Sequence, residues 1–270
     1  MPRELTEAEK AKPYSKYYYR ENAPAPKEAL SILDKGPIDP SLATTIHQCN
    51  DLLKPGYLPT EIGFCKMPDG TGFIAMKIDM PDATAEMIEW WFAWFGLESL
   101  RYMIWDPDAH YASYVIDEHL EHRLDSSLSN KERRWGTRII INEDIGLGAQ
   151  NLYIDFLSPE EFGHDPTLLK PPIATINNIN LGLSEIEKPV ACASHLYREI
   201  PGGLELRARF WLGWHIVDKK PVQVSDDVPF PLVKGLAYHC AYEYPNLAAI
   251  LPKVYHENVN VVDHVEDFRN

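Results

Sequence analysis

A series of short strand-like segments that ends in one long helix constrains the fold of this 270-residue chain more than any other feature. In the clearest segment, Leu204–Val217, apolar side chains at even positions 204–212 alternate with Glu205, Arg207 and Arg209. Because successive side chains of a strand point to opposite faces, one face of this strand is apolar and the other is charged. Strands joined by turns in this way predict an antiparallel sheet with one buried face.

A sheet with one apolar face needs a second layer to cover it. The segment from about Val233 to Leu251 carries apolar residues at one-turn spacing, with Pro229 and Pro231 before it and Pro252 after it. We therefore predict an α+β fold in which a curved antiparallel sheet grips a long C-terminal helix, with a cavity between them. The other predicted strands are Ile62–Met67, Gly72–Asp79, Trp135–Asn142, Asn151–Leu157, Ile173–Leu181 and Val190–Ile200.

The first 60 residues differ from the rest because they are rich in proline and mixed charge. We expect an N-terminal helical and irregular extension over residues 1–60, with short helices at Thr6–Ala11 and Pro40–Leu53, and one main domain over residues 61–270. A tyrosine cluster in this extension is expected to pack onto the main domain or onto a second subunit, which allows a dimer contact. The cluster consists of Tyr14, Tyr17, Tyr18 and Tyr19.

The charge and cysteine content exclude several classes of protein. The net charge is −14 and no basic run occurs, so we expect neither a nucleic-acid partner nor an anionic membrane surface. No run of about 18 apolar residues is present, and the charged N-terminus lacks the apolar core of a secretory signal. The four cysteines form no C-x-x-C pair, which favours free thiols in a reducing, cytoplasmic setting.

One candidate for chemistry is the pair His239 and Glu243 in the predicted C-terminal helix. Residues at i and i+4 lie on the same helix face about 5–6 Å apart, so an imidazole and a carboxylate can bind one metal ion from one side. Most such pairs are solvated or packed neighbours. The apolar residues around this pair, Leu236, Ala237, Cys240 and Ala241, favour a buried site.

Further candidates lie upstream. His110 follows a turn among aromatic residues, and Glu143 ends the apolar strand 139–141, where it is either a solvated strand end or a paired or coordinated carboxylate. His195 lies between apolar residues, and a core histidine is the common outcome there. The predicted helix Ala83–Phe95 contains the aromatic run 90–95, which indicates either core packing or the wall of a cavity for a flat organic ligand.

These candidates occur in an order that resembles the 2,4-diacetylphloroglucinol hydrolase / phloretin hydrolase family. The family comprises zinc-dependent enzymes that cleave the carbon–carbon bond between a phenolic ring and an acyl group, and it is similar in fold to Bet v 1-like helix-grip proteins. The resemblance extends from about residue 60 onward. It rests on Tyr102 and His110, the run Glu143-Asp-Ile-Gly146, the strand Arg209-Phe-Trp-Leu-Gly213, and His239-Cys-Ala-Tyr-Glu243.

The resemblance implies a role for individual residues. His110, Glu143, His239 and Glu243 correspond to the Zn²⁺ ligands. Tyr102 and His195 correspond to residues that contact the substrate and its phenolic hydroxyls, and Glu143 or Glu243 can act as the base for water. The implied reaction is that of a hydrolase acting on carbon–carbon bonds in ketonic substances, on an acylated phenol such as phloretin or 2,4-diacetylphloroglucinol. The family also suggests a homodimer, with residues 61–270 as the catalytic domain.

One position departs from the family pattern. Where the family can offer a second tyrosine hydroxyl to the substrate, this chain has Phe210. The substitution pattern of the substrate therefore stays open, as does the choice between a long arylpropanoyl arm and a compact diacetyl ring. Two alternatives also stay open, namely a helix-grip carrier that binds flat hydrophobic ligands without turnover, and a non-haem iron enzyme that uses the same histidines and carboxylates.

Overall fold

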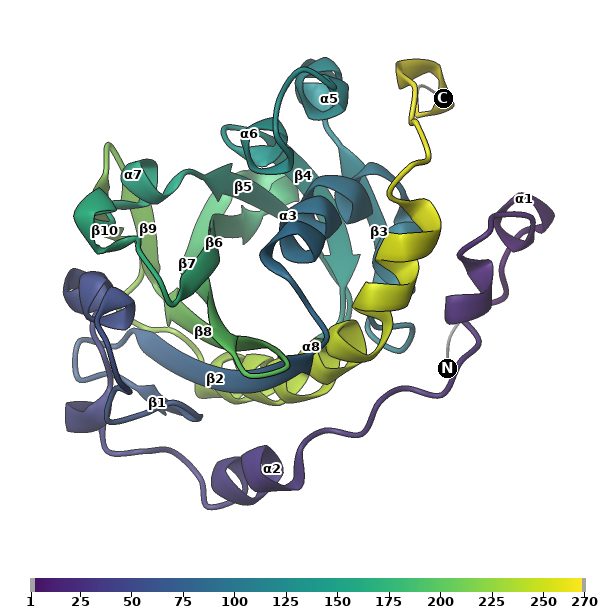
Figure 1. The fold of residues 1–270 in the computed structure, drawn as a ribbon. Coiled ribbons are helices and arrows are strands. Elements are labelled where there is room, and N and C mark those ends of the chain that lie inside the picture. The colour runs from purple at the N-terminus through teal and green to yellow at the C-terminus, as the bar shows by residue number, and fades with distance from the viewer. Residues whose placement is uncertain (1–2, 269–270) are drawn as a thin grey trace.

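A computed structural model describes residues 3–268 and shows one large antiparallel sheet wrapped around helices (Figure 1). Its strand order is β1-β2-β8-β7-β6-β5-β4-β3, so most strands pair with their neighbours in sequence. The predicted α+β class, with a curved sheet and a long C-terminal helix, is confirmed. The strands are β1 Gly63–Lys66, β2 Gly72–Pro81, β3 His110–Val115, β4 Arg138–Glu143, β5 Gln150–Leu157, β6 Ile173–Leu183, β7 Lys188–Ile200 and β8 Gly203–Leu212.

Two helices occupy the inner face of this sheet: α3, with the aromatic run, and the C-terminal α8, which packs along β1 and β2. Among residues 3–268, no helix combines the length and the apolar character that crossing a membrane requires. The α-helices are α1 Glu7–Lys10, α2 Lys27–Leu33, α3 Ala85–Trp94, α4 Ser99–Met103, α5 Asp117–Leu124, α6 Asn130–Arg134, α7 Pro159–Phe162 and α8 Phe230–Asn258. Short 3₁₀ segments lie at Ser15–Tyr17, Pro40–Leu42, Ile46–Leu53, Phe95–Leu97, Pro166–Leu168, Ser184–Ile186 and Val265–Asp267.

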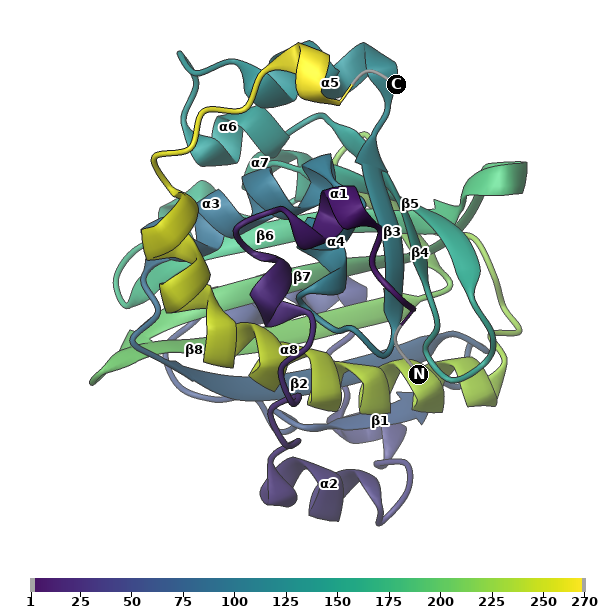
Figure 2. The ribbon, with the colours of Figure 1, turned by 90° about the vertical axis from the view of Figure 1, so that its right-hand side faces the viewer.

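The C-terminal helix is longer than the sequence predicts. The expectation that Pro252 follows the helix is wrong, because both Pro245 and Pro252 lie inside α8. A proline inside a helix removes one backbone hydrogen bond and tends to bend the helix, and α8 turns in its C-terminal half (Figure 2). Buried side chains on both sides of the prolines, including Leu247, Leu251 and Val254, keep the helix packed despite the lost bonds.

The predicted strand Leu204–Val217 is wrong in its second half, because β8 ends at Leu212. Gly213 has a φ of +88°, a left-handed conformation that favours glycine and turns the chain out of the sheet. A Cβ at this position would lie 2.9 Å from the carbonyl oxygen of Ser225. Beyond the turn, β9 Trp214–Val217 pairs with β10 Lys220–Gln223 in a separate two-stranded ribbon.

Both faces of the sheet are buried along β7 and β8, which corrects the expectation of one buried face there. Arg207 and Arg209 are fully buried because the Glu61 carboxylate pairs with both, at 2.6 and 2.8 Å. The same ion pairs hold the pKa of Glu61 at about 2, although burial opposes this shift. The 3₁₀ segment Ile46–Leu53 covers this outer face, where Leu52 packs in one cluster with residues of β6 and β7.

The tyrosine cluster packs mainly against its own chain. Tyr14 meets Trp94 edge to face at 5.0 Å between ring centroids, and the hydroxyl of Tyr17 donates to Glu257 at 3.0 Å. Tyr18 is also buried, whereas Tyr19 is exposed. The N-terminal segment thus lies against the main body of the molecule, and the division of the chain at residue 60 stays a prediction.

Candidate metal centre

Four side chains from the sheet and from α8 converge at one end of the molecule. His110 opens β3 and Glu143 closes β4, and the two residues are direct partners across these strands. His239 and Glu243 lie one turn apart on α8, and an oxygen of Glu243 is 3.5 Å from Nε2 of each histidine. The ligand atoms of His110, Glu143 and His239 all lie within 4.8 Å of one another.

The four side chains are buried, with exposed fractions of 0% for His110, 9% for Glu143, 7% for His239 and 6% for Glu243. For Glu243 and His239, burial disfavours the charged form, but the neighbouring charges outweigh it. Burial alone would raise the pKa of Glu243, whereas the histidines lower it to about 2. Burial would lower the pKa of His239, whereas the carboxylates, Glu243 foremost, raise it to about 9.

The arrangement of His110 fits a bound cation. Its Nδ1 lies 3.2 Å from the carbonyl oxygen of Tyr102, so Nδ1 carries a proton that it donates, and Nε2 is the ring nitrogen left to face a cation. That Nε2 is fully buried, has no hydrogen-bond partner among residues 3–268, and faces carboxylate oxygens of Glu143 and Glu243 at 3.9 and 3.5 Å. A lone pair beside two carboxylates is unfavourable unless a positive charge lies between them. Two imidazole nitrogens and two carboxylates form a donor set that suits zinc.

Aromatic residues hold these donors in place. The ring of Tyr102 stacks on His110 with 3.8 Å between centroids and 6° between planes, and its hydroxyl donates to Glu143 at 2.5 Å. The indole N–H of Trp105 donates to the backbone carbonyl of Glu243 at 2.9 Å. Such contacts to the outer side of ligating groups fix their orientation.

An inner cavity of about 60 Å³ lies between the donors and the sheet. His239 and Glu243 line its mouth, and most of its wall is apolar. The aromatic run 90–95 was predicted to form either core packing or a cavity wall, and it does both. Phe92 and Phe95 line the cavity, while the tryptophans of α3 pack in the core. The remaining wall comes from residues of β4 to β8, including Ile141, Phe156, Ile179, Leu181 and Phe210.

His195 lies in this cavity wall, on β7, and Phe210 faces its ring edge to face at 5.3 Å. Burial lowers the pKa of His195 to about 4, so the imidazole is neutral at pH 7. Its Nε2 lies 2.7 Å from the hydroxyl of Tyr244. Sequence reasoning missed Tyr244 and Trp105, although both stand next to predicted residues, Tyr244 directly after Glu243 and Trp105 between Tyr102 and His110.

A wider cleft of about 780 Å³ lies outside the donors, and His239 lines both this outer cleft and the inner cavity. The β4–β5 loop forms one edge of the cleft. Asp144 shapes that loop by accepting hydrogen bonds from the N–H groups of Gly146, Leu147 and Gly148.

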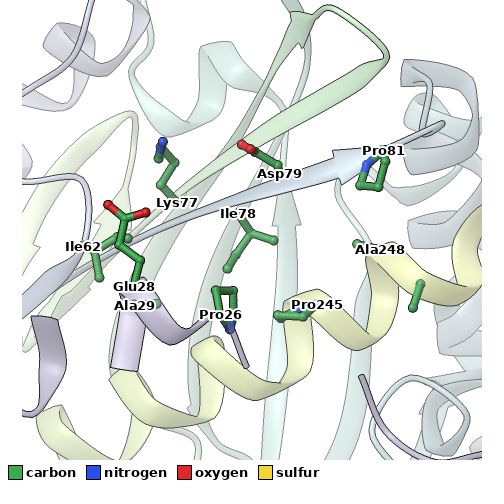
Figure 3. Close-up of a pocket in the computed structure, with 11 residues that line it drawn as sticks. Pro26, Glu28, Ala29, Ile62, Lys77, Ile78, Asp79, Pro81, Pro245 and Ala248 are labelled. Atoms are coloured by element: carbon green, nitrogen blue, oxygen red, sulfur yellow. The ribbon is translucent and has the colours of Figure 1, made fainter. Parts of the chain in front are cut away.

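A separate groove of about 350 Å³ lies between α2, β2 and α8 (Figure 3). Pro26, Ile78 and Pro245 line this groove, and none of the four donors does.

Most of the chain is similar in sequence to known proteins. Residues 42–256 match the family model described as DAPG hydrolase PhiG domain. The chain is 34% identical to a phloretin hydrolase of Eubacterium ramulus, over 94% of this chain and 93% of that protein. It is 31% identical to a 2,4-diacetylphloroglucinol hydrolase of a Pseudomonas species, over 91% of this chain and 88% of that protein.

Among solved structures, the chain is similar to norcoclaurine synthase from Thalictrum flavum, with a TM-score of 0.39 and 11% identity. The similarity covers 70% of this chain and 88% of that one. The helix-grip arrangement itself, a curved antiparallel sheet around a long C-terminal helix, follows from the strand order and from α8. The family match covers most of the chain, so the chain belongs to the DAPG hydrolase family.

Proposed function

We propose that this protein is a zinc-dependent hydrolase that cleaves the carbon–carbon bond between a polyhydroxylated aromatic ring and its acyl group. The observation that carries the proposal is the convergence of two histidines and two glutamates beside a largely apolar cavity, which Glu143, His239 and Glu243 line, in a member of the DAPG hydrolase family. The substrate class is an acylphloroglucinol such as phloretin or 2,4-diacetylphloroglucinol, the compounds named for two relatives.

His110, Glu143, His239 and Glu243 would hold the zinc ion. When bound, zinc supplies Lewis acidity and lowers the pKa of a coordinated water. The carboxylates of Glu143 and Glu243 both face the inner cavity, where each can accept a proton from water that enters it. A carrier of flat ligands would have no need for these four buried, charged groups, whose burial is costly without a function.

The reaction needs a proton on the ring carbon that loses the acyl group and a hydroxide on the acyl carbon. Protonation of the ring carbon converts one phenol into a ketone-like form, and the ring leaves as a delocalised phenolate rather than as an aryl carbanion. Neutral His195 can take the proton of a phenolic hydroxyl at Nδ1, which has no hydrogen-bond partner among residues 3–268, and return it, while its Nε2–H donates to the hydroxyl of Tyr244. Tyr102 would orient a second substrate oxygen beside Glu143.

The volumes of the inner cavity and the outer cleft indicate where the ring and the acyl arm of the substrate bind. The inner cavity, at about 60 Å³, is far smaller than a typical ligand pocket of several hundred Å³. The ring therefore enters only if cavity side chains move, and the acyl arm would extend past His239 into the outer cleft. That cleft is large enough for an arylpropanoyl arm, which favours a phloretin-like substrate.

Two further proposals concern the setting of the enzyme. A homodimer is suggested by the family resemblance, and the tyrosine cluster supports it less than expected because three of its four rings are buried within the chain.

A cytoplasmic location is supported by the four cysteines, all of which are free and buried.

The test is a hydrolysis assay with phloretin and 2,4-diacetylphloroglucinol, with products separated by chromatography. His239→Ala should lose bound metal and activity together. His256→Ala is the matched control, because this histidine lies on the same helix but is exposed. Full activity in His239→Ala would overturn the proposal, and iron in place of zinc would redirect it to oxygen-dependent chemistry.

A further inference from the structure

We propose that Asn177 is a specificity-determining residue that binds one hydroxyl of the aromatic ring inside the cavity. The inference rests on the proposed function, because it deepens the account of how an acylated phenol is recognised. It starts from an anomaly: Asn177 is 2% exposed, lines the inner cavity, and neither Oδ1 nor Nδ2 has a hydrogen-bond partner within the described residues.

The alternation of β6 directs this side chain into the cavity. Asn177, Ile179 and Leu181 all line the cavity from one face of the strand. Asn180 lies on the opposite face, where its amide bonds both backbone groups of Ile216 at 2.9 and 3.0 Å. Three asparagines of this strand are thus buried, Asn177, Asn178 and Asn180, but among residues 3–268 only Asn177, which faces the cavity, leaves both amide atoms unpaired, since Oδ1 of Asn178 is paired with His164 and Ser194.

An unpaired buried amide is costly, because the group has lost its hydrogen bonds to water without replacing them. An apolar residue of similar size would fit the surrounding wall of Phe92, Phe156 and Ile179 without that cost. The polar side chain is therefore explained if a ligand completes its hydrogen bonds. Its Oδ1 can accept a hydrogen bond from a phenolic O–H, and its Nδ2 can donate one to a phenolic oxygen.

The neighbour of Asn177 across the sheet narrows the class of ligand. His195 is its direct partner on β7, and cross-strand partners place their Cβ atoms about 4.5–5.5 Å apart on the same face. The two side chains therefore start from neighbouring positions on one face of the sheet, close enough for each to contact one of two hydroxyls that are meta to each other on one ring. Phloroglucinol rings carry that pattern. Phe210, opposite His195, offers no hydroxyl, so Asn177 supplies the second polar contact in this wall.

The experiment measures ligand binding directly, through quenching of tryptophan fluorescence, because Trp105 lines the cavity. The ligands are 2,4,6-trihydroxyacetophenone and 2-hydroxyacetophenone, which has a single ring hydroxyl. In Asn177→Leu, binding of the trihydroxy ligand should weaken about 10- to 100-fold, the usual effect of losing a buried hydrogen bond. Binding of the monohydroxy ligand should change little, and Tm should stay equal or rise, because an unpaired amide has been removed.

Asn180→Leu is the matched control. It removes two hydrogen bonds on the outer face, so Tm should fall while the preference for the trihydroxy ligand stays that of the wild type. An unchanged preference in Asn177→Leu would overturn the inference, as would a loss of Tm with equal weakening of both ligands. If the wild type binds these ketones with the predicted preference but hydrolyses neither phloretin nor 2,4-diacetylphloroglucinol, the proposed function fails and the role of Asn177 in binding stands.

Discussion

Replacing Glu243 by glutamine should destabilise the metal-free protein strongly, because its carboxylate compensates the buried histidines. Glu243 Oε2 lies 3.5 Å from Nε2 of both His110 and His239, and all three side chains are buried. Glutamine keeps the shape of the side chain and removes only its charge. The variant therefore isolates the electrostatic part of the interaction.

The pKa shifts of Glu243 and His239 give the size of the expected loss in the free energy of unfolding. That of Glu243 falls from 4.5 to about 2, and that of His239 rises from 6.5 to about 9. At about 1.4 kcal/mol per pKa unit, either change corresponds to about 3 kcal/mol. Both express the same attraction, so it is counted once. Removal of one partner of a buried ion pair typically costs about 3–5 kcal/mol, which agrees with this figure.

The pH dependence follows from the same shifts. The lowered pKa of Glu243 gives stability that is present above pH 4.5 and is lost as the pH falls toward 2. The raised pKa of His239 gives stability that is present below pH 6.5 and is lost as the pH rises toward 9. The contribution of the pair is therefore largest between pH 4.5 and 6.5.

The assay is urea unfolding followed by tryptophan fluorescence, in the presence of a chelator, at pH 5.5 and at pH 9. Glu243→Gln should lower the free energy of unfolding by about 3 kcal/mol at pH 5.5 and by much less at pH 9. Glu257→Gln is the control on the same helix, where the carboxylate pairs with exposed Lys16 and a change of at most about 1 kcal/mol is expected. Equal stability of Glu243→Gln and the wild type at pH 5.5 would refute the convergence of these side chains.

Three further predictions concern other parts of the structure. Tyr102→Phe should keep the stacking on His110 but remove the hydrogen bond to Glu143, which should lower kcat/KM about 10- to 100-fold in a hydrolysis assay without loss of bound zinc. Since burial lowers the pKa of His195 from 6.5 to about 4, its contribution to stability should be lost as the pH falls from 6.5 to 4, and His195→Phe should reduce the acid sensitivity seen in thermal unfolding. Glu61→Gln should cost about 3–5 kcal/mol in urea unfolding, because it leaves buried arginines without a carboxylate.

Sequence periodicity predicted the covering helix and the strands of the large sheet except β3, because alternation and one-turn spacing are local signals. It missed β3, His110–Val115, whose residues show no clear apolar alternation. It failed where a distant residue decides the outcome. The charged face of β8 reads as solvent-exposed, yet Arg207 is buried because Glu61, 146 residues away, meets it. Pro252 predicts a helix end, but tertiary packing keeps α8 continuous through it to Asn258.

For the site, the four-residue spacing of His239 and Glu243 was enough to predict that both side chains lie on one face of the C-terminal helix. His110 and Glu143 required the family resemblance, since only the pairing of β3 with β4 places them side by side. The structure brings all four together, while their role as zinc ligands stays a prediction. The sequence did not predict a role for Asn177, because the sequence of a strand does not show whether the amide of an asparagine has a hydrogen-bond partner.

The measurement that tests the central claim most directly is the metal content of the purified, untagged protein by elemental mass spectrometry, together with hydrolysis of phloretin before and after metal removal. The account predicts about one zinc per chain, loss of activity with loss of the metal, and its return when zinc is added back. Protein that contains no metal when prepared without chelators, and that still hydrolyses phloretin, would contradict the account.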